Sequence, residues 1–251
     1  MKKLALILLG ICMVLGSCKP TDKTKINYDG ESTINIVLLE DRNIGASSES
    51  ELVYYSDNEM IVTVDNNGVI HGKNVGEANV TIENSVNSIT IKVIVNLFEE
   101  PTVNFGVSSS YIKDIYGAPN YQFGDTIYIY GGGGSLEDWY SYAVWRMDFF
   151  FKDDAYSECD LYLNSDLKIR IDQFLSDNYH YYRTITDTIN TNEIINIDLF
   201  LNSAEAENAS VLVGKQENAG YYKDICLFYI PFDYNNKSLD RDIISRKRLS
   251  K

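Results

Sequence analysis

The sequence is poor in histidine, the side chain on which much acid–base chemistry near neutral pH depends. Its 251 residues include only His71 and His180. His71 ends a hairpin-like segment and is expected to lie in a surface turn, while His180 stands among tyrosines and is expected to pack with them. So few imidazoles leave little room for a histidine-rich metal site or a Ser-His-Asp triad. We therefore predict neither a metal nor a cofactor.

Basic side chains are also scarce. The chain carries 22 lysines and arginines against 36 aspartates and glutamates, a formal charge of −14. Because an acidic surface repels a phosphate backbone, nucleic acid is not expected as a partner. Hydrophobic residues make up 45% of the chain, so it contains enough apolar side chains to fold around a core.

Long apolar runs are absent beyond the first residues. Lys2 and Lys3 precede the apolar stretch Leu4 to Leu15, which small residues follow. The stretch is shorter than the roughly 20 residues that span a bilayer. A charged start, an apolar centre and a small-residue end are typical of a secretory signal peptide. We expect residues 1–17 to be removed from the mature chain.

The end of this segment reads Leu15-Gly16-Ser17-Cys18 and resembles the lipobox of bacterial lipoproteins. That resemblance implies that the Cys18 thiol receives a diacylglycerol and that Cys18 becomes the new N-terminus. Two or three acyl chains anchor a protein stably. The polar residues 18–30 are expected to form a flexible tether. We expect an outer-membrane lipoprotein in the cell envelope, with its periplasmic or surface orientation left open.

The remaining cysteines form a single pair. Cys12 would leave with the signal peptide and Cys18 would be acylated, which leaves Cys159 and Cys226. An exported protein meets an oxidising compartment, so the two could form a disulfide. Both also stand in apolar, strand-like runs where buried thiols are common. The sequence leaves both alternatives open.

Residues 31–98 alternate polar and apolar side chains in short runs, which predicts an all-β domain. Asp65-Asn66-Asn67-Gly68 is a strong hairpin signal. Together with Tyr54 to Asn58 and with Gly76 to Ile82, this segment resembles the bacterial Ig-like group 2 family, although Tyr replaces Trp at the opening. The resemblance implies an all-β Ig-like sandwich that acts as a spacer or display module and carries no chemistry.

Residues 102–236 combine helices and longer strands. Ser108 and Gly117 are expected to cap a first helix, and a second helix is expected over 165–178. Three strands follow each helix, with one added at the end. This order predicts an α+β domain, an antiparallel sheet with two helices on one face. Its opening, Gly106 to Pro119, resembles the SmpA/OmlA and β-lactamase-inhibitor-protein type of two-layer domain, which implies protein contacts. Residues 237–251 are predicted to be a basic, frayed tail.

Tyrosine is abundant, with 19 residues. If residues 131–138 close a hairpin that pairs Tyr130 with Tyr140, Tyr128 lies opposite Tyr142. All four side chains would then share the sheet face that the helices leave uncovered. A tyrosine platform suits sugar stacking or a protein hot spot. The alternative is that these residues are ordinary strand formers.

Signals for catalysis are weak. The glycine run 131–134 lacks the ending of a phosphate-binding loop. The pairs Asp153-Asp154 and Asp240/Asp242 are expected in solvated positions. We therefore expect a non-enzymatic, lipid-anchored binding, adhesion or accessory protein of the cell envelope, with a protein or glycan as its ligand. The alternative is a glycan-directed hydrolase with a carboxylate site in the second domain.

Overall fold

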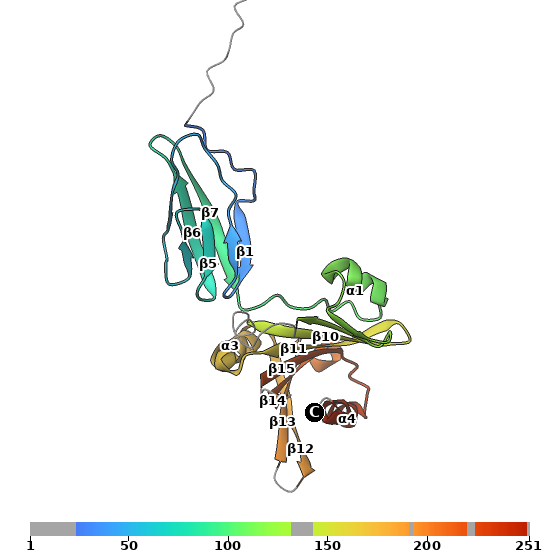
Figure 1. Cartoon of the computed structure of the whole chain (residues 1–251). Coiled ribbons are helices and arrows are strands. Elements are labelled where there is room, and N and C mark those ends of the chain that lie inside the picture. Colours follow the sequence, from blue (N-terminus) through green and yellow to red (C-terminus); the bar gives the residue numbers. More distant parts are fainter. Residues whose placement is uncertain (1–23, 132–142, 191–192, 220–223, 250–251) are drawn as a thin grey trace, which may run out of the picture.

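The computed structural model describes residues 24–131, 143–190, 193–219 and 224–249. About half of the chain, 49%, is in strands, so the prediction of a β-rich fold is confirmed. Two units follow one another along the chain (Figure 1). The tether residues from Thr24 onward belong to the first unit, and Cys18 lies outside the described residues.

The first unit contains two sheets. One has the strand order β1-β7-β6-β3, with β1 parallel to β7, and the other has the order β2-β5-β4. Buried side chains from both sheets fill the space between them, among them Ile36, Val62, Ile70, Val80 and Val93. The strands are β1 Thr33–Val37, β2 Asp41–Asn43, β3 Val53–Ser56, β4 Val62–Val64, β5 Val69–Gly72, β6 Gly76–Glu83 and β7 Ser88–Asn96.

The turn between β4 and β5 is built as the sequence predicts. Asp65 Oδ1 accepts hydrogen bonds from the backbone N–H groups of Asn67 at 2.9 Å and Val69 at 2.8 Å. Gly68 has a φ of 76°, a conformation that glycine adopts without steric cost. These hydrogen bonds lower the pKa of the Asp65 carboxyl, the one from Val69 having the largest effect. The turn residue is therefore structural.

The second unit is built on one eight-stranded sheet with the order β12-β13-β14-β15-β11-β10-β9-β8. Each half of the sheet is a four-stranded antiparallel meander that follows a helix, and the last strands of the two halves, β11 and β15, pair in the middle. The first half is α1 Ser109–Tyr116, β8 Tyr121–Phe123, β9 Ile127–Gly131, β10 Val144–Lys152 and β11 Ala155–Leu163. The second is α3 Lys168–Asn178, β12 His180–Asn190, β13 Glu193–Leu201, β14 Val211–Ala219 and β15 Asp224–Pro231.

The two halves therefore match more closely than the sequence predicts. Three strands are predicted after the first helix, but the chain turns back at Gly124, whose φ is 54°, and forms the two short strands β8 and β9. That turn supplies the fourth strand of the first half. Two one-turn 3-10 helices, Ser165–Leu167 before α3 and Ala206–Asn208 before β14, complete the unit.

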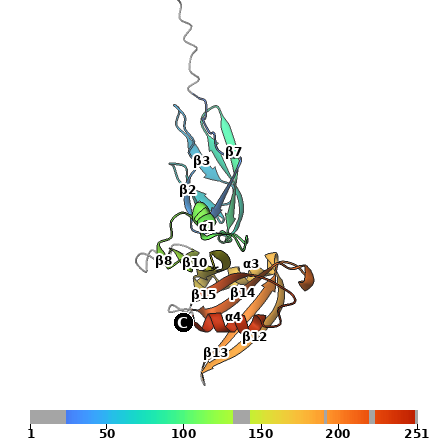
Figure 2. The same cartoon turned by 90° about the vertical axis from the view of Figure 1, so that its right-hand side faces the viewer.

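Helices cover both faces of this sheet. Ile112 of α1 and Ile171 and Leu175 of α3 are buried in the same core cluster as several side chains of β11, namely Tyr156, Cys159, Leu161 and Leu163. The opposite face carries α4, Leu239–Leu249, whose Leu239 and Ile243 are buried in one cluster with side chains of strands β12 to β15 (Figure 2). The prediction of a frayed tail over 237–251 is therefore wrong, because two apolar side chains one helical turn apart anchor the segment.

No helix in the described part of the chain combines the length and the apolar character that crossing a bilayer requires.

Candidate functional site

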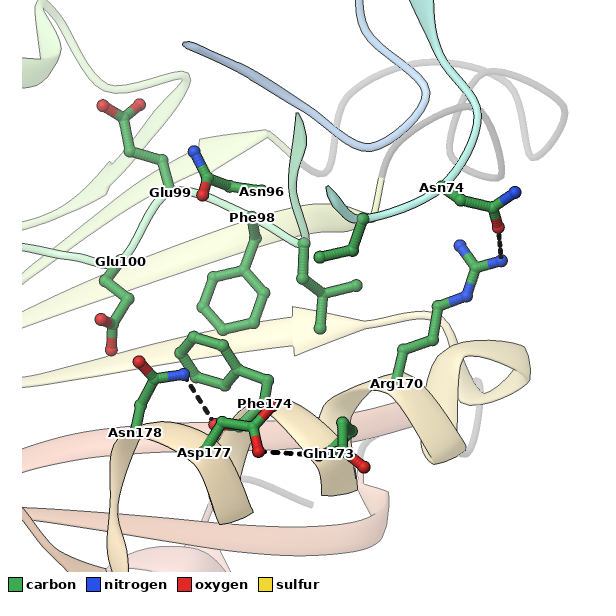
Figure 3. Close-up of a pocket in the computed structure, with 12 residues that line it drawn as sticks. Asn74, Asn96, Phe98, Glu99, Glu100, Arg170, Gln173, Phe174, Asp177 and Asn178 are labelled. Atoms are coloured by element: carbon green, nitrogen blue, oxygen red, sulfur yellow. Dashed lines mark hydrogen bonds between the residues drawn. The ribbon is translucent and has the colours of Figure 1, made fainter. Parts of the chain in front are cut away.

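A pocket of about 590 Å³ lies where the two units meet. The first unit contributes the loop before β6, the end of β7 and the segment that follows it. The second unit contributes the exposed side of α3 (Figure 3). The residues that line the pocket are Asn74, Val75, Asn96, Leu97, Phe98, Glu99, Glu100, Arg170, Gln173, Phe174, Asp177 and Asn178. We call this pocket the inter-unit cleft.

The floor of the cleft is apolar and rigid. Leu97 and Phe98 are buried directly after β7. The ring of Phe98 packs on Phe174 of α3 with centroids 4.7 Å apart, and Phe174 continues to Tyr179 at 6.2 Å. These contacts join the cores of the two units into one cluster. This aromatic packing holds the apolar base of the cleft in place between its polar rims.

Two polar contacts hold the cleft at its ends. Arg170 Nη2 donates to Asn74 Oδ1 at 2.5 Å and so links α3 to the first unit (Figure 3). Glu100 Oε1 accepts hydrogen bonds from the hydroxyl groups of Tyr179 and, at 3.1 Å, Tyr229. Burial raises the pKa of both tyrosines, and Glu100 raises it further. The two phenols therefore remain protonated donors, and the segment after β7 stays fastened to the sheet.

The rims carry more negative than positive side chains. Glu99, Glu100 and Asp177 provide three carboxylates against the single guanidinium of Arg170. Gln173 Nε2 already donates to Asp177 Oδ1 at 2.7 Å, and Asn178 Nδ2 donates to the Phe174 carbonyl at 2.9 Å. The cleft thus presents negative charge and acceptor oxygens above an apolar floor.

The carboxylates of the cleft are exposed to solvent. A carboxylic acid that works as a general acid near neutral pH needs burial or a like-charged neighbour to raise its pKa. Exposed, solvated carboxylates are better suited to hydrogen bonding and charge recognition. The geometry of the cleft therefore favours binding over proton transfer.

A second polar cluster fastens α3 to the sheet. The Lys215 ammonium is nearly buried and lies 2.7 Å from Asp172 Oδ1, 3.1 Å from Glu217 Oε1 and 3.7 Å from Asp198 Oδ2. Lys168 bridges Asp172 and Glu217 from the helix side. These ion pairs join Lys168 and Asp172 of α3 to Lys215 and Glu217 of β14. The cluster thereby positions α3, the helix that forms one wall of the cleft.

The tyrosine platform predicted from the sequence is not formed at Tyr128 and Tyr130. Tyr128 is buried, its ring lies under the Lys113 ammonium of α1 at 4.4 Å, and Tyr130 donates to the Gly117 carbonyl at 3.0 Å. Both residues therefore face α1, on the covered side of the sheet. Tyr140 and Tyr142 lie outside the described residues. The prediction of a shared, uncovered face is wrong for the two tyrosines that the structure describes.

Cys159 and Cys226 are both buried, free thiols in the structure. Cys159 pairs with Tyr229 across β11 and β15, whereas Cys226 pairs with Tyr162. The two cysteines are thus offset by three residues along neighbouring strands and point to opposite faces. Burial raises the pKa of the Cys159 thiol well above its ordinary value, so this side chain is an inert core residue.

The acidic pairs considered for catalysis have other roles. Asp153 and Asp154, with φ values of 52° and 62°, form the tight turn between β10 and β11. Asp154 Oδ1 accepts from the Ser109 backbone N–H at 3.0 Å, and hydrogen bonds with the side chain and the backbone of Ser109, the side-chain one having the larger effect, lower the pKa of Asp154. Asp240 forms an ion pair with Arg183 of β12, which helps to hold α4 on the sheet. Glycines 132–134 lie outside the described residues. Among the described residues, no group of three or more His, Cys, Asp or Glu side chains is arranged for a metal ion.

The sequence did not point to the inter-unit cleft. Asn74 and Arg170 are 96 residues apart, and neither belongs to a motif. The available signals were Glu99 and Glu100, which interrupt the apolar pattern at the domain boundary, and the polar positions on the outer side of the second predicted helix.

Comparisons with known proteins place few constraints on the chain. No protein-family model matches it, and no curated protein matches it either. A weak structural neighbour is the crystal structure of a GH10 xylanase from termite gut that contains a bacterial Ig-like domain. The identity is 16%, the TM-score is 0.25, and the match covers 33% of this chain and 23% of that chain. The match thus covers less than a quarter of the xylanase, and at this TM-score the two structures are only weakly alike.

Proposed function

We propose that this chain is a lipid-anchored protein of the cell envelope that binds a partner and is not an enzyme. In this proposal the first unit is a bacterial Ig-like sandwich that acts as a spacer. The second unit is an α+β domain, and the cleft between the units is the binding site.

The strand arrangement of the first unit supports the Ig-like assignment. An immunoglobulin sandwich places its second, fifth and fourth strands in one sheet and its third, sixth and seventh in the other. The sheets β2-β5-β4 and β3-β6-β7 have this distribution, and β1 adds to the second sheet beside β7. The hairpin and the strand that carry the sequence resemblance correspond to β4, β5 and β6.

The observation that carries the proposal is the placement of the cleft relative to the start of the chain. Asn84 Nδ2 and Asn87 Nδ2, in the turn between β6 and β7, donate to the Thr24 carbonyl at 2.7 and 2.8 Å. The cleft lies at the other ends of the same two strands, next to Gly76 and Asn96. Eight residues of β6 span about 25 Å. A lipid on Cys18 would therefore leave the cleft on the side directed away from the membrane.

Cell fractionation tests the anchor. The Cys18→Ala variant is expected to move from the membrane pellet to the soluble fraction, while a Cys159→Ala control stays in the pellet. If Cys18→Ala still sediments with membranes after a high-salt wash, the lipid anchor is wrong.

Affinity capture and an activity screen test binding against catalysis. The wild-type protein and a Val75→Lys variant, which alters the cleft, are incubated with envelope extracts, and their bound partners are compared. A partner that the wild type retains and Val75→Lys loses supports the binding function. Release of reducing sugars from envelope glycans by the purified protein, abolished in an Asp177→Asn variant, would instead support the hydrolase alternative.

A further inference from the structure

We infer that the inter-unit cleft takes a cationic peptide segment in which an apolar side chain is flanked by lysine or arginine. This inference rests on the proposed binding function and adds the class of ligand. It does not depend on the lipid anchor.

The charge of the cleft selects the sign of the ligand. Glu99, Glu100 and Asp177 line the groove, and Arg170 stands at the end where it is already hydrogen-bonded to Asn74. The negative charge that the groove offers to a ligand is that of Glu99 and Asp177, because Glu100 already accepts hydrogen bonds from Tyr179 and Tyr229. The whole chain adds a long-range field of the same sign, with a formal charge of −14. An anionic ligand would be repelled by both.

The hydrogen-bonding capacity of the rims selects donors. Carboxylates accept hydrogen bonds and cannot donate while ionised. One N–H of Gln173 and one of Asn178 are already used inside α3. Lysine and arginine side chains carry three and five donors without any acceptor, so they complement this lining better than a sugar hydroxyl, which needs both donors and acceptors.

The floor selects an apolar side chain between those charges. Leu97 and Phe98 form an apolar base between the polar rims, and Val75, 48% exposed, extends it toward solvent. Because Phe98 is 5% exposed and Phe174 is half-buried against it, the floor offers little ring area for a flat sugar to stack on. In such a ligand, an aliphatic side chain would contact the apolar base of the cleft, and the basic residues on either side of it would reach the carboxylates of the rims.

Isothermal titration with short blocked peptides tests this inference. The probe has one leucine with two lysines on each side. Two matched peptides replace the lysines by glutamates or the leucine by serine, and an N-acetylglucosamine tetramer tests the glycan alternative. The protein is the mature full-length chain with Cys18→Ala, or the lipidated chain in detergent.

We expect the lysine–leucine peptide to bind, the glutamate peptide to show no heat, and added salt to weaken binding. Asp177→Asn and Glu99→Gln should each weaken binding about 2- to 5-fold, as expected for exposed charge pairs. Val75→Lys, which places a like charge in the groove, should weaken it further. The control Glu51→Gln removes an exposed carboxylate beside β3, at the Glu83 end of β6, and should leave affinity unchanged.

Three results would overturn the inference. The first is equal binding of the lysine and glutamate peptides, and the second is that Glu51→Gln weakens binding of the lysine–leucine peptide as much as Asp177→Asn does. The third is that no peptide binds at all. Binding of the N-acetylglucosamine tetramer in place of the peptides would overturn the ligand class and leave the proposed binding function intact. Failure of the binding function itself would show separately, as the absence of any Val75-dependent partner in envelope extracts.

Discussion

Tyr128 of β9 lies directly opposite Phe149 of β10. The sequence predicted Tyr142 at that place, so the observed register differs from the predicted one by an odd number of residues. Because side chains alternate between faces, an odd shift moves a whole strand's set of side chains to the other face. Tyr128 and Tyr130 therefore lie against α1, where Phe149 also packs on Tyr116 with centroids 4.9 Å apart.

Local features of the fold follow from the sequence because they depend on neighbouring residues. Ser108 caps α1 by accepting from the Tyr111 N–H, and Gly117 ends the helix with a φ of 79°, both as expected. The turn at Asp65 to Gly68 also forms where the hairpin signal predicts it, between β4 and β5. In each of these places a cap, a turn residue or a regular alternation determines the structure within a few residues.

Features of the fold that depend on contacts between distant residues could not be predicted from the sequence. The register of β10 is interrupted between Val144 and Arg146, which turns Trp145 toward Tyr162 on the opposite face from Phe149. A bulge of this kind breaks the alternation on which the prediction relied. The cleft, likewise, exists only because Phe98 meets Phe174 across 76 residues of chain. No local pattern encodes that contact.

Gly214 is expected to tolerate no side chain. A Cβ at this position would overlap the ring of Phe228, which is fully buried on β15. Gly214→Ala should lower the free energy of unfolding by about 1–3 kcal/mol, the usual cost of overpacking a core. In a Phe228→Leu background the same substitution should cost clearly less. Chemical denaturation of the four proteins of this cycle measures the difference, and equal costs in both backgrounds would show that the ring is not the obstacle.

Helix α4 is expected to contribute to the stability of the second unit. Ile243 is 2% exposed and packs against the sheet. Ile243→Ala should therefore destabilise the protein by about 2–4 kcal/mol, as truncation of a buried isoleucine does. Arg241→Ala, at an exposed position two residues earlier, is the matched control and should cost less than about 0.5 kcal/mol. Equal effects of the two substitutions in thermal denaturation would restore the interpretation of a frayed tail.

The Lys215 cluster predicts a loss of stability in acid. A hydrogen bond from Lys168 lowers the pKa of Glu217, and for Asp172 the hydrogen bonds from Lys215 and Lys168 outweigh the effect of burial and lower the pKa as well. Folded-state pKa values below the ordinary 4.5 and 3.8 mean that this stability is present above those values and is lost as the pH falls through the folded ones.

Urea denaturation at a series of pH values measures that dependence. The wild type should lose stability as the pH is lowered below about 4.5, and Lys215→Met should flatten the decline because the cation that favours the ionised carboxylates is gone. Asp187→Asn, outside the cluster, is the control. A Lys215→Met protein with an unchanged pH profile would mean that the cluster does not couple to folding.

The thiols of Cys159 and Cys226 should be protected in the native state. Cys159 is fully buried and Cys226 is 2% exposed, so a thiol reagent such as Ellman's reagent should react slowly until the protein is unfolded. In denaturant without reductant it should then detect both. Intact-mass measurement gives the independent result, since a disulfide would make the chain lighter by two hydrogens, and that outcome would contradict the offset of the two cysteines across β11 and β15.

Photo-crosslinking in cells that produce the lipidated chain tests the central claim, partner binding at the inter-unit cleft, most directly. A photoreactive phenylalanine analogue replaces Asn96, an exposed residue of the cleft, or Glu51 at the other end of the first unit. The account predicts a discrete crosslinked species from position 96 that position 51 does not give and that Val75→Lys removes. Identical patterns from both positions, or a species from position 96 that survives Val75→Lys, would contradict it.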